Sequence, residues 1–548
     1  MAHTTDRRRL RRPALALLAG AALVAVAACS GGGAGTTNGA AAGPEGSPVP
    51  GGRLVYGLGA DADGFNPVRD SFAAQTYAMA GTIIEPLVAV DASGAWRPLL
   101  AESLTPAENG AQWTIKIRKG IRFSTGEPLD AAVVKANLDA QKASPLTAAV
   151  LAPVRGVEVL DDHTLQVHLG QPWGSFPYVL ADQIGMIIPR SSLANPEQAS
   201  RRPVGTGPFL FQSYAPDNRF VVRKNPNYWR KGLPYLDQIE FRILPDFQTK
   251  AQTLEAGGLT AMATQRDDDI VKFGKLARQG QYRVYQPTGM TVPELAFMLN
   301  TAAAPLDDLR VRRALAHATD RQAFIKTLRS GLTKPADGPW SPDSKWYVPG
   351  GYPEFDLAKA KALIAQYERE KGPVRFELLS VPDQASMQNA ELAQDMWRKA
   401  GAEVTIRQTE QADLIQRALT GAYGAAVWTQ FTDADPDGEY SWLHERFARP
   451  VGQVSINMSR IRDPQLSAAL DTGRRSRDEA VRKQAYATVQ RRLREQLPFI
   501  FVDHLTTSAV ITKANVKGLA RSTLPDGSQA RALTGSPTHR FDQIWIGG

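Results

Sequence analysis

The residue types that carry most enzyme chemistry are scattered along this sequence. Its seven histidines lie far apart, and it contains neither a His-Glu-x-x-His motif nor a Gly-x-Ser-x-Gly nucleophile turn. Ser341 and Lys345 are one residue too far apart for a Ser-x-x-Lys pair. Asp267-Asp-Asp269 is interpreted as a solvated helix start, because adjacent aspartates point in different directions. We therefore expect no catalytic residue, no metal site and no cofactor, and we do not expect an enzyme.

The N-terminal residues indicate export from the cytoplasm. Five arginines between Arg7 and Arg12 precede an apolar and small-residue run from Ala14 to Ala28. This run is shorter than the roughly 20 residues that span a bilayer and is typical of a secretory signal. Its end, Val26-Ala-Ala-Cys29, resembles the lipobox of bacterial lipoproteins. The resemblance implies that Cys29, the only cysteine, is lipidated and begins the mature chain at the extracytoplasmic face of the cell membrane.

The composition and charge of the chain are typical of an ordinary globular protein. It has 548 residues, of which 43% are hydrophobic and 22% charged, enough for two to four domains. The net charge is +9, of which residues 1–28 hold +4, so the remainder is too weakly basic to suggest nucleic-acid binding. Residues 29–52, rich in Gly, Ala, Ser, Thr and Pro, are expected to form a flexible tether.

Strand and helix patterns alternate irregularly along the body of the chain. Arg53–Leu58 and Trp113–Arg118 have the period-two pattern of strands, and Asp130 is placed to cap the next helix. Gly205 and Gly207 bracket a tight turn in which a positive φ is expected. Asp320 is expected near the end of a helix with one apolar stripe from Val311 to Ala318. These patterns favour a mixed α/β protein whose domains are not consecutive blocks.

Several motifs in order along the chain carry a family resemblance. They are Trp113-Thr-Ile-Lys-Ile-Arg-Lys-Gly-Ile-Arg-Phe-Ser-Thr-Gly-Glu-Pro-Leu129, Val204-Gly-Thr-Gly-Pro-Phe209, Asn225-Pro-Asn-Tyr-Trp229 with Leu233-Pro-Tyr-Leu-Asp237, Leu306-Asp-Asp-Leu-Arg-Val-Arg-Arg-Ala-Leu315 with Ala318-Thr-Asp-Arg321, Phe355-Asp-Leu-Ala-Lys-Ala-Lys-Ala-Leu363, and Asp435-Pro-Asp437. Together they resemble family 5 solute-binding proteins, the peptide, nickel and oligosaccharide receptors of bacterial ABC importers. The resemblance extends from Arg53 to about residue 510.

The resemblance implies a type II periplasmic-binding-protein fold with two hinged lobes and an inserted domain. The implied parts are a signal peptide (1–28), a tether (29–52), lobe I (53–91, 201–288 and 509–548), an inserted domain (92–200) and lobe II (289–508). Ligand would lie between the lobes, which close around it. The implied partners are a small solute and ABC permease subunits in the membrane, with the protein itself a monomer.

The peptide-binding branch of the family suggests where a ligand would be anchored. There, an Asp holds the peptide's α-ammonium. This Asp comes three residues after a strand Trp and four residues before the proline of an Asp-Pro motif. Here Trp428 and Pro436 are present but one residue farther apart, so the two counts reach Phe431 and Thr432, which are not acidic. Asp433 is the nearest carboxylate. This departure argues against a peptide with a free amino terminus.

Other residues are candidates for the same site. Tyr423, Trp428, Phe431 and Tyr440 offer an aromatic wall for a sugar, a peptidic metabolite or an aromatic ligand, or else belong to the core. Asp61 and Asp63 come after the first strand, where the family's lobe I contacts arise, and otherwise form a turn. We also include Asn300, at the end of the Phe297–Asn300 segment that leads into lobe II.

This interpretation is compatible with two functions. The first is a lipid-anchored receptor that captures a peptide or other small solute for an ABC importer. The alternative is a receptor-like lipoprotein that signals to a membrane partner, or assists it, without transport. The sequence does not separate them, because both need the same scaffold.

Overall fold

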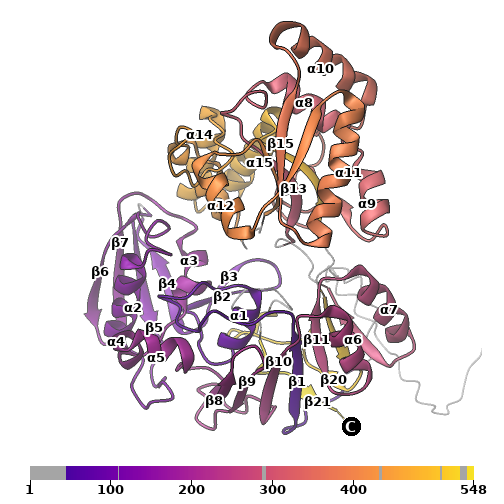
Figure 1. Cartoon of the computed structure of the whole chain (residues 1–548). Helices are drawn as coiled ribbons and strands as arrows, with labels where there is room; N and C mark the ends of the chain where they lie inside the picture. Colours follow the sequence, from indigo (N-terminus) through magenta and orange to yellow (C-terminus); the bar gives the residue numbers. More distant parts are fainter. Residues whose placement is uncertain are drawn as a thin grey trace, which may run out of the picture. The chain divides into compact units, whose positions relative to one another are not determined.

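We describe the protein from a computed structural model that covers residues 45–108, 110–286, 292–430, 435–505, 509–530 and 540–547. Three sheets dominate these residues, each with its own apolar core (Figure 1). Strands and helices are mixed throughout, which confirms the α/β class predicted from the sequence.

The first sheet has seven strands that come from distant parts of the chain, in the order β12-β19-β11-β1-β10-β9-β8. In its central strand, Leu54, Tyr56 and Leu58 are buried, as the period-two pattern predicts. The strands are β1 (Arg53–Leu58), β8 (Phe209–Ala215), β9 (Arg219–Lys224), β10 (Gln238–Ile243), β11 (Ala261–Thr264), β12 (Tyr282–Tyr285) and β19 (Ala509–Lys513), and the helices that accompany them are α1 (Ala74–Ala80), α6 (Phe247–Glu255) and α7 (Asp267–Arg278).

A four-stranded antiparallel sheet, in the order β4-β5-β7-β6, comes after β1 in the chain. Its core contains Trp113, Ile115 and Ile117 on one face of β5, and Asp130 caps α2 by accepting from the Val133 N–H at 2.8 Å. Both features are as predicted. We call this part the four-stranded domain: β4 (Ala101–Pro106), β5 (Gln112–Ile117), β6 (Val154–Asp161), β7 (Thr164–Leu169), α2 (Ala131–Ala143), α3 (Phe176–Val179), α4 (Arg190–Ala194), α5 (Pro196–Arg201) and the short η1 (Gln183–Gly185), with the hairpin β2 (Val88–Val90) and β3 (Trp96–Pro98) beside it.

The third sheet has six strands in the order β14-β18-β13-β17-β15-β16 and lies within residues 292–505, which we call the six-stranded domain. Its strands are β13 (Glu294–Leu299), β14 (Lys334–Pro335), β15 (Arg375–Ser380), β16 (Glu403–Gln408), β17 (Ala425–Gln430) and β18 (Phe499–His504). Its helices are α8 (Leu309–Ala318), α9 (Arg321–Leu328), α10 (Leu357–Lys371), α11 (Gln384–Ala400), α12 (Gln411–Thr420), α13 (Tyr440–Leu443), α14 (Pro464–Arg475) and α15 (Glu479–Gln496), with η2 (Pro436–Glu439) and η3 (Glu445–Phe447).

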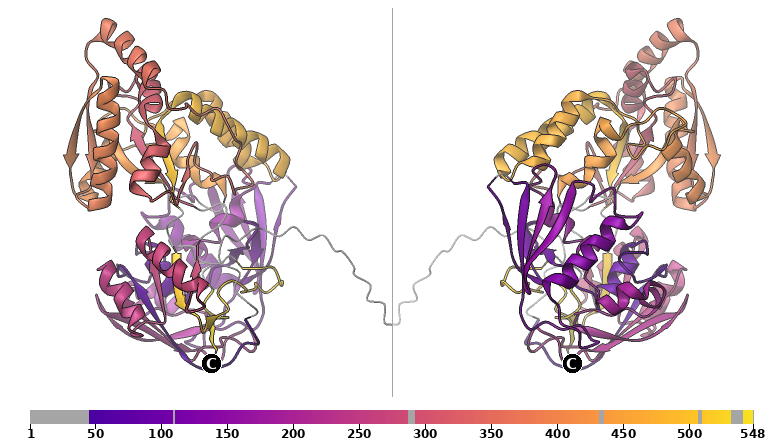
Figure 2. Two further views of the ribbon diagram at one scale, coloured as in Figure 1. Left: turned by 90° about the vertical axis from the view of Figure 1, so that its right-hand side faces the viewer. Right: turned by 90° about the vertical axis from the view of Figure 1, so that its left-hand side faces the viewer.

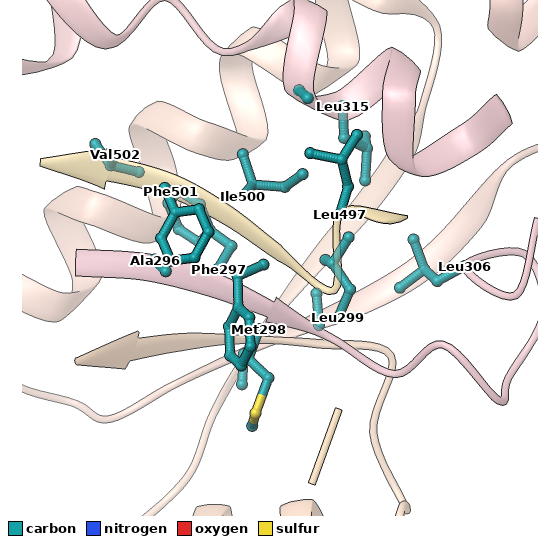
Figure 3. Close-up of a cluster of buried hydrophobic side chains, with 14 of the residues drawn as sticks. Ala296, Phe297, Met298, Leu299, Leu306, Leu315, Leu497, Ile500, Phe501 and Val502 are labelled. Atoms are coloured by element: carbon teal, nitrogen blue, oxygen red, sulfur yellow. The ribbon is translucent and has the colours of Figure 1, made fainter. Parts of the chain in front are cut away.

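The core of the six-stranded domain is built on β13 and β18. All six residues of each strand are buried, and apolar side chains of both strands meet Leu306 and Leu315 (Figure 3). Phe297 packs edge-to-face against Trp397, with ring centroids 5.0 Å apart. The apolar stripe of α8 predicted from Val311 to Ala318 is buried against this core.

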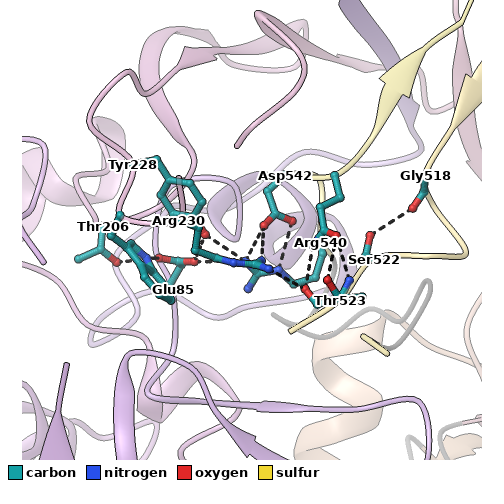
Figure 4. A network of polar contacts seen from close by, with 11 residues as sticks. Glu85, Thr206, Tyr228, Arg230, Gly518, Ser522, Thr523, Arg540 and Asp542 are labelled. Carbon is teal, nitrogen blue, oxygen red and sulfur yellow. Dashed lines mark hydrogen bonds and ion pairs between the residues drawn. The ribbon is translucent and has the colours of Figure 1, made fainter. Parts of the chain in front are cut away.

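A buried polar network fastens the C-terminal segment to the seven-stranded sheet (Figure 4). Arg540 lies between Asp542 at 2.9 Å and Glu85 at 3.4 Å, and Arg230 reaches Asp542 at 2.7 Å. The Tyr228 hydroxyl donates to Glu85 at 2.7 Å. Each of these buried charges therefore has a partner, which a buried charge requires. The segment that ends in β21 (Trp545–Ile546) pairs there with β20 (Val516–Lys517).

Two local predictions need correction, and a third is extended. Gly205 and Gly207 do not have positive φ; they are glycines because a Cβ would lie 2.1 and 2.5 Å from the Ile83 carbonyl oxygen. Asp269 does belong to a helix start, but it is buried and accepts from the Thr264 hydroxyl at 2.6 Å, so it is not solvated. Asp320 lies two residues after the end of α8, as expected, and it also caps the next helix, α9, through the Ala323 N–H.

None of the helices among the described residues has the length and apolarity needed to cross a membrane.

Candidate functional site

The carboxyl ends of several strands meet at one edge of the seven-stranded sheet. β1 is parallel to β10 and β11, so Leu58, Ile243 and Thr264 end at the same edge. β12 ends there too, and β19 begins there, because β19 is antiparallel to both β11 and β12. In open α/β sheets, ligands bind outside the carboxyl ends of the strands. This edge is therefore one half of the candidate site.

The six-stranded sheet has a corresponding edge. β15 is parallel to β16 and β17, so Ser380, Gln408 and Gln430 end together. β13 runs the opposite way and begins beside Gln430 at Glu294, and β18 ends beside Glu294 at His504. The chain passes between the two sheets twice, from β12 to β13 and from β18 to β19, and both passages start or finish at these edges. The two edges are thus the ends of the sheets that adjoin these passages along the chain.

Polar side chains stand in a row across this edge of the six-stranded sheet. Gln430, Glu294 and His504 are direct cross-strand partners, so their side chains share one face of the sheet. Trp428, two residues before Gln430, lies on the same face and donates from Nε1 to the Gln430 Oε1 at 2.9 Å. The Gln430 Nε2 donates onward to Glu439 at 3.1 Å. We call Trp428, Gln430, Glu294, Glu439 and His504 the edge cluster.

Two buried groups of the edge cluster, Glu294 and His504, have pKa values far from their usual ones. Burial raises the pKa of Glu294 well above its usual range, and the nearby Glu439 raises it further. Burial also lowers the pKa of His504 to about 4, with Lys334 lowering it further. Among the described residues, neither carboxylate oxygen of Glu294 and neither ring nitrogen of His504 has a hydrogen-bond partner. Perturbed titratable groups of this kind are typical of functional sites.

The sequence-predicted residues divide between two ends of β17. Trp428 lies at the carboxyl edge and is half-buried. Tyr423 and Asn300 lie together at the opposite end, where the Asn300 amide donates to the Gly421 and Tyr423 carbonyls at 3.0 Å. The Tyr423 hydroxyl donates to the Met458 carbonyl at 2.8 Å. Both side chains are therefore hydrogen-bonded to backbone groups of their own domain. For Tyr423 this is a position in the core, which the sequence left open as the alternative to an aromatic wall.

Tyr440 comes directly after η2 and is buried. Its hydroxyl donates to Asp471 at 2.7 Å, and the Arg474 guanidinium lies over its ring, 3.4 Å from the centroid. One face of the Tyr440 ring is thus covered by Arg474.

The two aspartates after β1 lie at the carboxyl edge of the seven-stranded sheet. Asp61 accepts from the Tyr214 hydroxyl at 2.8 Å and from the Asp217 N–H at 2.7 Å, so its carboxylate is engaged in shaping the turn. Asp63 is exposed. Phe431, Thr432 and Asp433, which come directly after Gln430, and the predicted lipidation site Cys29 lie outside the described residues.

Sequence reasoning missed Glu294, Glu439, Gln430 and His504. A signal was present for two of them: Glu294 begins, and His504 ends, runs that are otherwise mostly apolar (Glu294–Leu299 and Phe499–His504). A polar residue that ends a buried strand stands at a sheet edge, where loops and ligands meet. The register that places the two residues side by side is not visible in the sequence.

The four-stranded domain contacts the six-stranded domain through Asp437. This buried carboxylate accepts from the Trp173 Nε1 and from the Ser175 Oγ, both at 2.7 Å, and pairs with Arg474 at 2.7 Å within its own domain. The Gly174 N–H also donates to the Arg474 carbonyl at 2.7 Å, and α14 and α15 lie beside the four-stranded domain (Figure 2). Although burial raises the pKa of Asp437, Arg474 and the other donors hold it below its usual value.

A groove of about 810 Å³ lies elsewhere, on the four-stranded domain. Lys116, Arg118, Lys119, Trp229 and Lys231 contribute to its lining. It is wide open and is not at the carboxyl edge of either large sheet. We therefore place the candidate site at the two edges and not in this groove.

The two large sheets have their carboxyl edges at the two chain passages that connect them, and a smaller third sheet accompanies the first. This arrangement is typical of binding proteins that hold a ligand between two domains. The chain belongs to the bacterial extracellular solute-binding proteins, family 5, whose model matches residues 95–446. This is a family of binding proteins that act outside the cytoplasm.

Individual relatives are more distant. The chain is 28% identical over 533 residues to Protein XP55 of Streptomyces lividans, which covers 90% of this chain and 93% of that protein. It is 27% identical over 453 residues to the nickel-binding periplasmic protein of Escherichia coli K12, with 78% and 84% covered. Among solved structures, the periplasmic binding protein DppA from Helicobacter pylori, in complex with the peptide STSA, matches with a TM-score of 0.77 at 23% identity, covering 91% of this chain and 99% of that one. The fold is that of a type II periplasmic binding protein.

Proposed function

We propose that this protein is a lipid-anchored substrate-binding protein of an ABC importer. It captures a peptide or other small solute between two lobes that close on it, and it delivers the solute to permease subunits in the membrane. Within this proposal, lobe I contains the seven-stranded sheet and lobe II is the six-stranded domain. Cys29 is the point of lipid attachment, and the ligand residues include Trp428 together with Phe431 and Asp433 just beyond it.

The observation that carries the proposal is the pair of carboxyl edges joined by two chain passages. Strands of both sheets end there: β1 ends at Leu58 and leads into the turn that contains Asp63, and β17 ends at Gln430, two residues after Trp428. A solute between such edges is enclosed when the domains rotate about the passages. Relatives that bind a peptide in one case and nickel in another support a small solute without choosing its chemistry.

Closure needs only that the solute binds the closed arrangement more tightly than the open one. The contacts of Trp173 and Ser175 with Asp437 are suited to stabilise the closed arrangement, because they join two separately folded cores. Buried apolar surface then supplies affinity, and a few polar groups select the solute.

The first experiment is native mass spectrometry of the full chain extracted from expressing cells, compared with the same sample after denaturation. We expect a reproducible additional mass that is lost on denaturation. A ladder of peptide masses would support a peptide receptor, and one discrete mass would support a single metabolite or sugar. No additional mass, together with no shift of the thermal midpoint by any compound in a solute screen, would contradict the proposal.

A second measurement separates transport from signalling. Uptake of the identified solute is compared in cells that lack this protein and in cells that lack the cognate permease. A transport receptor requires both for uptake. If the protein keeps its cellular effect when the permease is deleted, the alternative of a signalling lipoprotein replaces the proposal.

A further inference from the structure

Glu294 is a buried acid that the described fold does not satisfy. Its side chain is 0% exposed, and neither carboxylate oxygen has a hydrogen-bond partner among the described residues. A buried polar group without a partner costs about 1–3 kcal/mol, and a buried charge costs more. Such groups are few in native proteins, and each calls for an explanation such as an absent ligand. A core position by itself would favour an apolar residue here, as in the rest of β13.

His504 provides a second, independent observation at the same place. It is the direct cross-strand neighbour of Glu294, it is 0% exposed, and both of its ring nitrogens lack partners within the described part of the chain. Directly opposed residues of an antiparallel pair have Cβ atoms about 4.5–5.5 Å apart, so the two side chains emerge next to each other. One neutral imidazole nitrogen accepts hydrogen bonds, as carboxylate oxygens do. The unsatisfied groups at this point are therefore mainly acceptors that await a donor.

A second acid and an aromatic ring complete the surroundings. The Gln430 amide, on the other side of Glu294, donates to the buried Glu439 at 3.1 Å, and Glu439 acts electrostatically on Glu294. The half-buried Trp428 is fixed by its bond to Gln430 at 2.9 Å. The raised pKa of Glu294 favours its protonated form in the solute-free protein. A positive group that donates N–H bonds would favour the ionised carboxylates of Glu294 and Glu439, and an indole face attracts the same group through its quadrupole. This set of residues suits an ammonium or guanidinium group.

We propose that the edge cluster is a subsite in which Glu294 and Glu439 receive a cationic nitrogen group of the transported solute, with His504 and Trp428 beside it. The inference rests on the proposed function, because it assigns chemistry to the solute of that site. In the peptide-binding branch, an Asp three residues after the strand Trp holds the positive group. In this chain Trp428 and Pro436 are one residue farther apart, and the corresponding position is not acidic. The edge cluster therefore gives the positive group a different anchor. The solute is accordingly an amine or guanidine compound.

The test uses the solute released from the full chain and measures its rebinding by calorimetry. The variants are Glu294→Gln, Glu439→Gln and, as a matched control, Glu391→Gln on the exposed side of α11. Gln nearly matches a protonated Glu in shape, so thermal unfolding of the solute-free variants is expected to stay close to that of the wild type. We expect Glu294→Gln and Glu439→Gln each to weaken binding at least tenfold, and Glu391→Gln to leave it unchanged.

Chemical modification of the solute distinguishes the two cationic groups. Acetylation removes the charge of primary amines and leaves guanidinium groups charged. Loss of binding after acetylation assigns an ammonium to the subsite, and retained binding by a guanidine-containing solute assigns the guanidinium.

The outcomes separate this inference from the function on which it rests. A solute without a basic nitrogen, a metal ion or complex as the bound species, or equal affinity of wild type and Glu294→Gln would overturn the subsite and leave a solute receptor standing. If the wild type releases no solute and no compound of the solute screen, with tri-lysine, spermidine and arginine included, shifts its thermal midpoint, the proposed function is contradicted and the subsite with it.

Discussion

At the scale of single residues, the protein places ionisable groups where water does not reach. In the six-stranded domain, the carboxylate of Asp503 is paired with Arg329 at 3.1 Å and accepts from the Thr333 hydroxyl at 2.8 Å. The neighbouring His504 and Glu294 have no such partners among the residues that the structure describes. Pairing offsets the cost of burying Asp503. Any group whose pKa differs between the folded and the unfolded chain, paired or not, makes stability depend on pH.

His504 is expected to make the protein sensitive to acid. Its pKa falls from 6.5 unfolded to about 4 folded, mainly because of burial, so the unfolded chain binds the extra proton between these values. Its contribution is fully present above pH 6.5 and is lost as the pH falls toward 4. By linkage, the loss at pH 5 is about 2 kcal/mol. We expect His504→Gln to lose correspondingly less stability than the wild type between pH 7 and pH 5, measured by urea unfolding.

The groups that face His504 remain in both proteins, so the difference between them isolates the histidine. They are Glu294 on β13, Lys334 on β14 and the more distant Asp343. Glu294 has the opposite effect, because its raised pKa favours the folded state as pH falls. The exposed His168→Gln on β7 is the control. An identical pH dependence of wild type and His504→Gln would contradict the burial argument.

At the scale of elements, two separately folded cores are joined by a small set of polar contacts. The segment before α3 brings Trp173 and Ser175 to Asp437 in η2. Hydrogen bonds to a charged acceptor contribute about 1.5–3 kcal/mol each. Because these bonds connect two domains, they stabilise only arrangements in which the domains touch. Under the proposed function, such contacts would adjust the population of the closed state without touching the solute.

Ser175→Ala is expected to weaken solute binding. The change removes one bond from the four-stranded domain to Asp437 and leaves the Trp173 bond in place. We expect about a tenfold weaker affinity, equivalent to about 1.4 kcal/mol, because the closed state is less populated. Calorimetry with the released solute measures the affinity, and small-angle scattering of the solute-free protein measures its mean dimensions, which should increase.

Ser191→Ala is the matched control, since Ser191 is exposed and its hydroxyl donates to Glu127 within the four-stranded domain. Unchanged affinity and scattering in Ser175→Ala would show that this contact does not control closure.

At the scale of the whole molecule, the predicted lipid attachment and the candidate binding edges belong to different parts of the chain. The two carboxyl edges and the three cores lie after residue 45. The predicted lipid attachment at Cys29 precedes them, in a Gly-rich segment that contributes no apolar pattern. Removing the anchor is therefore expected to change location and leave binding intact.

Cys29→Ser is expected to release the protein from the membrane. A lipidated cysteine anchors a protein through its acyl chains, each buried CH₂ contributing about 0.8 kcal/mol, and serine does not accept the lipid. Cell fractionation should move the protein from the membrane pellet to the soluble extracytoplasmic fraction, with solute affinity unchanged. Ser30→Ala is the control and should remain in the pellet. Retention of Cys29→Ser in the pellet would contradict lipid anchoring.

The sequence by itself determined the features that depend on interactions between residues close together in the chain. The strand at Arg53–Leu58, the cap at Asp130 and the α8 stripe depend on periodicity and on side-chain bonds to nearby backbone, so they could be predicted. The ordered motifs determined the family and the α/β class. Trp428 could be proposed because it adjoins the Asp-Pro motif.

Only the tertiary structure decided which distant residues meet. Strand register places His504 beside Glu294 across 210 residues, and a domain contact places Ser175 on Asp437. Close approach to the Ile83 carbonyl, and not φ, requires glycine at 205 and 207. Asn300 and Tyr423 meet at the end of their strands away from Trp428. Pairing, burial and the resulting desolvation arise between segments, so no local pattern in the chain encodes them.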